Sequence, residues 1–266
     1  MRRAAPLLLA LVLAPGCGWF SRPSTWEEWL NETPAAWKAG NHAKVFELCS
    51  NAFDAAHLAK QGAKAVLALE CMAEASTREE KPEKAFPAYA IVLRDYVADA
   101  FKSGSGLRLR NNYGANLVNA GEKQAGLAML EEALDADEGT IYHSSGNYRL
   151  RMFVVANLAR AARVFADTPT GIRVSSEILF EIENHLVNER FRQNMQLTLG
   201  TADALLAIAE LVRLRGDPVR AEEIVANARQ QRAVEDVLLE GQQRRPQCEP
   251  RIIRALSITS CYAEVK

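Results

Sequence analysis

Apolar side chains recur at three- and four-residue spacing along much of this chain, which is the pattern of helices that bury one face. In the segment 173–192, for example, Ile178, Ile182 and Leu186 fall on one helical face. Alanine and leucine dominate, glycine is sparse, and no Asn-Gly pair between alternating apolar runs signals a hairpin. The pattern therefore predicts an all-α protein.

Small residues also recur at a fixed set of spacings in at least two places. The matching positions are Gly114, Gly121, Gly126 and Ala133 in one segment and Ala209, Gly216, Ala221 and Ala228 in another. This spacing resembles that of the tetratricopeptide repeat (TPR) family, in which small residues let two helices cross closely and a glycine ends the first helix. Weaker matches begin near Thr33, Ala73 and Ala156, so the resemblance covers roughly residues 29–232.

The resemblance implies a right-handed superhelical solenoid of about five helix pairs. We expect helices at 34–39 with 42–56, 60–76 with 82–97, 106–120 with 123–136, 148–166 with 173–192 and 197–215 with 218–232, then a helix near 234–242. Such pairs stack because none buries its apolar face alone, and their first helices line a concave groove. Ile252, Ile253, Leu256 and Ile258 are expected to cover the last pair as a cap.

The N-terminal segment resembles a bacterial lipoprotein signal peptide. Arg2 and Arg3 precede an apolar run that is too short to span a bilayer, and Gly16 stands directly before Cys17. The resemblance implies a signal peptide over 1–16 and a Cys17 that carries acyl chains such as palmitate, which together hold a protein stably on a membrane. In such lipoproteins an Asp directly after the lipidated cysteine favours retention in the inner membrane. Gly18 occupies that position here, so the resemblance favours the outer membrane, facing the periplasm. The alternative is an ordinary cleaved secretory signal.

These segments predict the domain organisation. The signal peptide at 1–16 is followed by a tether at 17–25, a TPR-like domain at 26–243 and a cap or tail at 244–266. The charges nearly balance, with 32 Lys and Arg against 33 Asp and Glu. This balance argues against a nucleic-acid partner.

Four cysteines remain once Cys17 is set aside. In an oxidising compartment an even number suggests two disulfides, and four cysteines allow three pairings. Cys49 and Cys71 lie at comparable distances on either side of a predicted turn near 59–61, so two antiparallel helices would bring them face to face. Cys248 and Cys261 would then close the tail. The alternative is four buried free thiols.

The sequence contains no recognisable catalytic, metal or cofactor site. His42, His57, His143 and His185 are scattered, and no two have the spacing that places metal ligands on one helical face. His143 is followed by two serines, but a Ser/His pair adjacent in sequence is not a triad signature. We therefore expect a protein that is not an enzyme and has no cofactor.

The predicted groove is the better candidate for function. In the TPR family, basic and Asn residues on the first helices often hold a partner's peptide backbone or carboxylate, and both side chains suit this task. The corresponding residues here are Arg108, Asn111, Asn112, Arg149, Asn157 and Arg160. The alternative is a solvated, unoccupied surface. The loop 138–148, which is longer than the repeat needs, is a second candidate for partner contact.

These features predict a membrane-anchored scaffold or adaptor that binds another cell-envelope protein, as in assembly, secretion, pilus or motility complexes. The rival interpretation is a ligand- or lipid-binding component of a transport system, with an apolar tunnel through the solenoid. An apolar cavity would favour the rival, whereas a polar, open groove would favour a protein partner.

Overall fold

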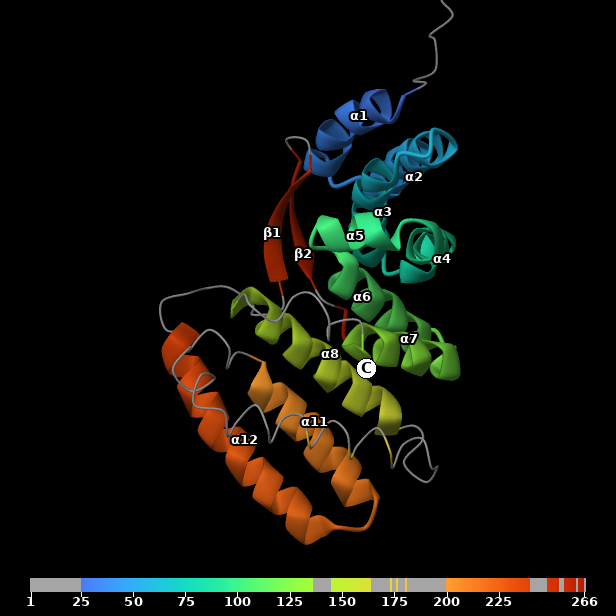
Figure 1. The fold of residues 1–266 in the computed structure, drawn as a ribbon. Coiled ribbons are helices and arrows are strands. Elements are labelled where there is room, and N and C mark those ends of the chain that lie inside the picture. The colour runs from blue at the N-terminus through green and yellow to red at the C-terminus, as the bar shows by residue number, and fades with distance from the viewer. Residues whose placement is uncertain are drawn as a thin grey trace, which may run out of the picture.

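The chain folds as a stack of helix pairs with a β-hairpin beside it (Figure 1). The computed structural model describes residues 25–135, 145–163, 200–239, 248–253, 256–261 and 263–265, together with 173, 176 and 180. The helices in chain order are α1 (Trp26–Lys38), α2 (His42–Leu58), α3 (Gly62–Arg78), α4 (Phe86–Asp95), α5 (Val97–Lys102), α6 (Gly106–Asn119), α7 (Lys123–Asp135), α8 (Ser145–Arg163), α11 (Thr201–Leu214) and α12 (Pro218–Leu239). This order confirms the predicted all-α helical repeat.

Consecutive helices pack antiparallel, and the pairs stack on one another. Helix α1 packs on α2, α2 on α3, α6 on α7 and α11 on α12. The first helices of successive units also contact each other: α6 contacts α8, and α8 contacts α11. Side chains on α6 and α8 can therefore act together although the helices are far apart in sequence.

The crossing of α6 and α7 depends on two glycines. A Cβ added to Gly126 would lie 2.5 Å from Val118 Cγ2 and 2.6 Å from the carbonyl oxygen of Gly114. A Cβ added to Gly114 would lie 2.8 Å from Leu130 Cγ. These distances leave no room for a side chain, so both positions require glycine, where the repeat spacing predicts small residues. Gly121, with φ +94°, lies in the turn between the two helices.

The first helix begins earlier than predicted, at Trp26 instead of near residue 34. Thr25 caps it, because the Thr25 side chain accepts from the Glu28 amide and the Glu28 side chain accepts from the Thr25 amide. Pro34 lies inside the helix, where it removes one backbone hydrogen bond. Burial of Trp26 and Leu30 offsets that cost.

Two other boundaries also differ from the prediction. The helix expected at 82–97 consists of a 3₁₀ turn, η1 (Pro82–Ala85), followed by α4 and the short α5. Tyr96, whose backbone leaves the helical region, separates α4 from α5. The helices expected at 218–232 and 234–242 form the single helix α12.

The buried side chains form two main clusters along the stack. One is built from α1 to α6 and includes Cys49 and Cys71, and the other extends from α6 to α12. A disulfide joins Cys49 on α2 to Cys71 on α3, where the two Cα atoms lie 5.9 Å apart. Both cysteines are fully buried, so the disulfide lies within the first cluster.

The C-terminal tail runs back along the repeat instead of ending on its last pair. Strands β1 (Cys248–Ile253) and β2 (Leu256–Cys261) form an antiparallel hairpin, and β2 contacts α3 (Figure 1). The hairpin register places the backbones of Cys248 and Cys261 opposite each other. Residues 263–265 then lie against α6 and α8 in the middle of the stack.

Candidate functional site

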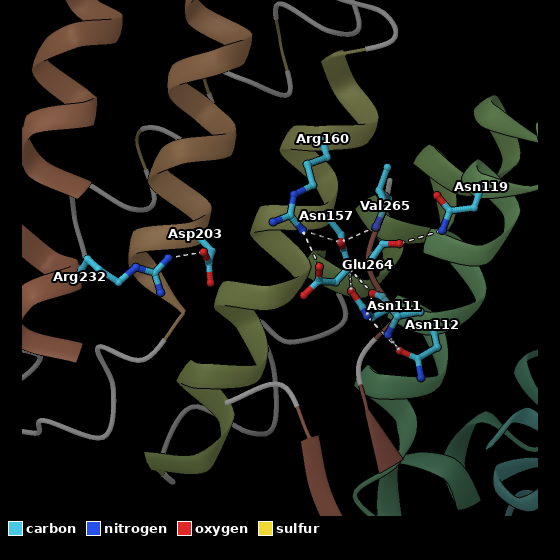
Figure 2. A network of polar contacts seen from close by, with 10 residues as sticks. Asn111, Asn112, Asn119, Asn157, Arg160, Asp203, Arg232, Glu264 and Val265 are labelled. Atoms are coloured by element: carbon cyan, nitrogen blue, oxygen red, sulfur yellow. Dashed lines mark hydrogen bonds and ion pairs between the residues drawn. The ribbon is translucent and has the colours of Figure 1, made fainter. Parts of the chain in front are cut away.

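The candidate site lies where α6 and α8 run side by side. Helix α6 contributes Asn111, Asn112 and Asn119, and α8 contributes Asn157 and Arg160 (Figure 2). Gly114 on α6 faces the crossing with α7, whereas the Asn111 and Asn112 side chains reach Asn157 of α8 and the tail. The helical repeat thus brings together two groups of polar residues that are more than forty positions apart, as Asn111 and Asn157 are.

Residues 263–265 of the same chain occupy this site (Figure 2). The Ala263 amide donates to Asn112 Oδ1 at 2.8 Å, and the Val265 amide donates to Asn157 Oδ1 at 3.0 Å. The Ala263 carbonyl accepts from Asn157 Nδ2 at 2.7 Å and from Asn111 Nδ2 at 3.3 Å. The site therefore holds the tail through donors and acceptors of its main chain.

The asparagines also hold one another in place. Asn157 Nδ2 donates to Asn111 Oδ1 at 2.8 Å, and Asn111 Nδ2 donates to Asn112 Oδ1 at 3.1 Å. Asn111 is fully buried and Asn157 is 1% exposed, so each amide is held in one orientation by buried hydrogen bonds. We call Asn111, Asn112, Asn119 and Asn157 the asparagine clamp.

Asn119 extends the clamp along α6. Its Nδ2 donates to the Glu264 carbonyl at 2.8 Å, at an exposed position. Asn119 follows Asn112 by two helical turns, so the two residues lie on nearly the same face of α6. That spacing is the signal by which sequence reasoning could have found it.

Two side chains of the tail meet side chains of the site. Val265 is 5% exposed and joins the apolar cluster that includes Ala115, Val118 and Ala156. The Glu264 carboxylate lies 4.0 Å from Arg160 Nη1, and this pair is partly exposed to solvent. Arg160 also reaches Asn157 Oδ1 at 3.4 Å, so it connects the acidic side chain to the clamp. The site therefore contacts an acidic residue followed by an apolar one.

Arg108 does not belong to this site, which corrects its expected place in the groove. It is 2% exposed and forms a buried ion pair with Glu70 of α3. Tyr89 is buried nearby, and burial raises the pKa of its hydroxyl. Asn111 is also buried, so neither residue lies on the open groove surface that the repeat spacing predicts.

The remaining candidates fall partly or wholly outside the described residues. Arg149 lies in α8, but its side chain is outside them, as are those of Cys248 and Cys261. Cys17, His143 and His185 are likewise outside the described ranges, as are residues 138–144 of the loop expected at 138–148; residues 145–148 of that loop belong to α8 instead. Within those ranges, no helix combines the length and the apolar character needed to cross a membrane. The same ranges contain no cluster of three or more His, Cys, Asp or Glu that could hold a metal ion.

Sequence reasoning missed the occupant of the site. Ala263, Glu264 and Val265 belong to a short C-terminal stretch that has neither helical nor strand periodicity. Nothing local predicts that such a stretch returns to α6 and α8, because the contacts span more than a hundred residues, as between Ala263 and Asn157.

Comparison with known proteins identifies the fold. A solved structure from Podosopora anserina, assigned as a kinesin light chain with nearly identical TPR-like repeats, is 14% identical with a TM-score of 0.51 and covers 82% of this chain and 97% of its own. A variant of the same protein gives 14% identity and a TM-score of 0.52, covering 80% of this chain and 96% of its own. No protein-family model and no curated protein matches this sequence. The fold is therefore TPR-like.

Proposed function

We propose that this TPR-like chain is a membrane-anchored adaptor that binds an extended segment of another cell-envelope protein between α6 and α8. The observation that carries the proposal is the asparagine clamp, which holds the main chain of residues 263–265. A site that engages three successive residues of its own chain in this way has the chemistry to engage three residues of another.

The amide side chain explains why asparagine suits this task. An extended segment presents an N–H and a C=O at each residue, and an Asn side chain offers both a donor and an acceptor. Asn157 uses both, because it donates to the Ala263 carbonyl and accepts from the Val265 amide. The Asn157 side chain thus binds two main-chain groups of the segment, one carbonyl and one amide.

The polar character of the site favours a protein partner over a lipid or another apolar ligand. Four amide side chains and one guanidinium line the tail, whereas Val265 enters an apolar cluster and Ala263 packs against its edge. An apolar tunnel, which the rival transport function needs, would have to be lined by apolar side chains.

The location of the protein rests on the N-terminal sequence alone. Arg2, Arg3, the short apolar run and the Gly16-Cys17 junction support export and acylation at Cys17. Gly18 supports placement in the outer membrane, facing the periplasm. Intact-mass measurement of the protein extracted from membranes tests this: a chain that begins at Cys17 with added acyl mass is expected, and an unmodified mature chain in the soluble fraction would refute it.

Partner capture tests the adaptor function. Because Asn112 also holds residues 263–265 of the chain itself, the full-length chain is used with Val265→Asp, which should free the site of its own tail. This chain, its Asn112→Ala variant and its Gln124→Ala control are each used to capture proteins from detergent-solubilised envelopes; Gln124 is an exposed residue of α7. A partner that binds between α6 and α8 is recovered with the first chain and the control and is reduced at least several-fold with Asn112→Ala. Equal recovery with all three chains would place the interaction elsewhere.

A further inference from the structure

We infer that residues 263–265 are a built-in competitor that closes the α6–α8 site until a partner segment of similar chemistry displaces them. The inference rests on the proposed function, and it adds how access to the site is controlled and which class of segment opens it. The expected segment is extended and carries a small residue, an acidic residue and a β-branched aliphatic residue in that order, as Ala263, Glu264 and Val265 do.

The first argument is that the tail engages each member of the asparagine clamp. Asn111, Asn112 and Asn157 bind the Ala263 main chain, Asn119 binds Glu264, and Asn157 also binds Val265. A second segment cannot form the same hydrogen bonds while the tail is present. Binding of a partner here therefore requires the tail to leave.

The second argument is that the tail is held by interactions another peptide can reproduce. Its hydrogen bonds to the clamp come from main-chain atoms, which every non-proline residue offers. Glu264 and Asn119 are exposed, so this end of the contact is accessible to solvent. A partner segment that displaces the tail can therefore form the same main-chain hydrogen bonds to the clamp.

The third argument concerns side-chain selection. The Val265 position joins an apolar cluster and is 5% exposed, which suits a compact aliphatic side chain and excludes a charged one. At the preceding position Arg160 lies 4.0 Å from the Glu264 carboxylate and favours an acidic residue (Figure 2). The Ala263 side chain is half-buried against the same cluster, which favours a small residue.

The tail has an advantage because it is tethered. A segment linked to its own site acts at an effective concentration on the order of 1 mM. A free peptide whose intrinsic Kd is about 10 μM would then bind the closed site roughly a hundredfold more weakly than the open one. Removing the tail should reveal this difference.

The test uses a fluorescent peptide with the sequence of residues 262–266 and measures its Kd by anisotropy. Its binding is compared for the full-length chain in detergent and for a chain that ends at Tyr262. The inference predicts at least tenfold tighter binding to the shortened chain. It also predicts that a peptide carrying Val265→Asp binds that chain at least tenfold more weakly, and that a peptide carrying Glu264→Lys binds it several-fold more weakly.

A second variant keeps the test decisive if the shortened chain does not fold. Val265→Asp in the full-length chain places a carboxylate in an apolar cluster and should release the tail, so it should also bind the wild-type peptide at least tenfold more tightly than the wild-type chain does. Melting temperatures report whether each chain is folded. Equal Kd values for the wild type and a folded open variant, or no binding to either open variant, would overturn the inference.

The outcome is separable from that of the proposed function. If the peptide binds the open site tightly but capture of the envelope partner is unchanged by Asn112→Ala, the tail regulates the site and the adaptor proposal is wrong. If Asn112→Ala abolishes capture while removal of the tail changes no affinity, the adaptor proposal stands and the competitor inference is wrong.

Discussion

At the scale of single residues, polar side chains that sequence spacing places in an open groove are buried in the structure. Arg108 and Asn111 occupy inward-facing positions of α6, as the TPR resemblance implies, but Arg108 pairs with Glu70 and Asn111 lies under the tail. Helical spacing predicts the direction of a side chain and says nothing about what covers it. Charged and amide residues at these positions are therefore part of the folded core.

The buried ion pair predicts a large effect of a single substitution. Arg108→Met leaves the Glu70 carboxylate buried without its guanidinium, which should lower the free energy of unfolding by about 3–5 kcal/mol. The double variant Arg108→Met with Glu70→Leu removes both charges and should recover most of that loss. Urea unfolding of the two variants and the wild type measures this. A single variant within about 1 kcal/mol of the wild type would contradict the assignment of the pair.

Glu74 predicts a dependence of stability on pH. Burial raises the pKa of its carboxyl above the ordinary 4.5, although Arg78 opposes the shift. Because the folded state then binds the proton more tightly than the unfolded state, the contribution of Glu74 to stability falls as pH rises from 4.5 through the folded pKa. The free energy of unfolding of Glu74→Gln should therefore increase relative to that of the wild type as pH rises from about 4 to about 7.

Asp95 provides the matched control of opposite sign. A hydrogen bond from Arg94 lowers the pKa of its carboxyl. Its contribution is present above the ordinary pKa and is lost as pH falls, so Asp95→Asn should lose stability relative to the wild type as pH rises. Unfolding measured across this pH range should give slopes of opposite sign for the two variants. Equal slopes would refute the burial argument for Glu74.

At the scale of elements, the helix pairs could be predicted from the sequence where small residues mark a crossing. Gly114, Gly121 and Gly126 predict α6 and α7 to within about one residue at each end, because close packing and a positive φ tolerate few alternatives. Prediction failed at α1, where the cap at Thr25 and burial outweigh Pro34. It also failed at the hairpin, whose connecting Arg254-Ala255 carries no turn signal.

The close crossing of α6 and α7 predicts that a single methyl group added at the crossing lowers the stability of the fold. Gly126→Ala places a Cβ against Val118 and the backbone of Gly114, so the helices must separate. The expected loss of stability is about 1–3 kcal/mol, although alanine is the better helix former. Gln124→Ala, at an exposed position of the same helix, is the control and should be neutral or slightly stabilising. Thermal unfolding distinguishes the two, and equal melting temperatures would contradict the crossing.

The disulfide between α2 and α3 predicts sensitivity to reductant. It links residues separated by 22 positions, and constraint of the unfolded chain by such a loop contributes about 3 kcal/mol. Urea unfolding of the wild type should shift to lower urea when a reductant is added. The double variant Cys49→Ala with Cys71→Ala should unfold at low urea with or without reductant. A wild type that does not respond to reductant would show that the bond does not form in the protein.

At the scale of the whole molecule, the C-terminal tail contacts helices that are far from it in the sequence. The hairpin contacts α3, and residues 263–265 join α6 to α8 (Figure 1). A solenoid contacts mainly its neighbours along the chain, so its fold follows from local spacing. The return of the tail is a contact between distant parts of the sequence, and no local pattern encodes it. That is why Asn111, Asn112 and Asn157 could be predicted and the segment that they hold could not.

The measurement that tests the central claim most directly is amide hydrogen exchange at Ala263 and Val265, followed by NMR. The claim is that the asparagine clamp holds the main chain of the tail, with the Ala263 amide donating to Asn112 and the Val265 amide to Asn157. Both amides should exchange at least about tenfold more slowly than in an unfolded chain, since exchange requires the hydrogen bond to open. Asn112→Ala should accelerate exchange at Ala263 more than at Val265. Exchange at both amides as fast as in the isolated peptide 262–266 would show that the tail is not held between α6 and α8.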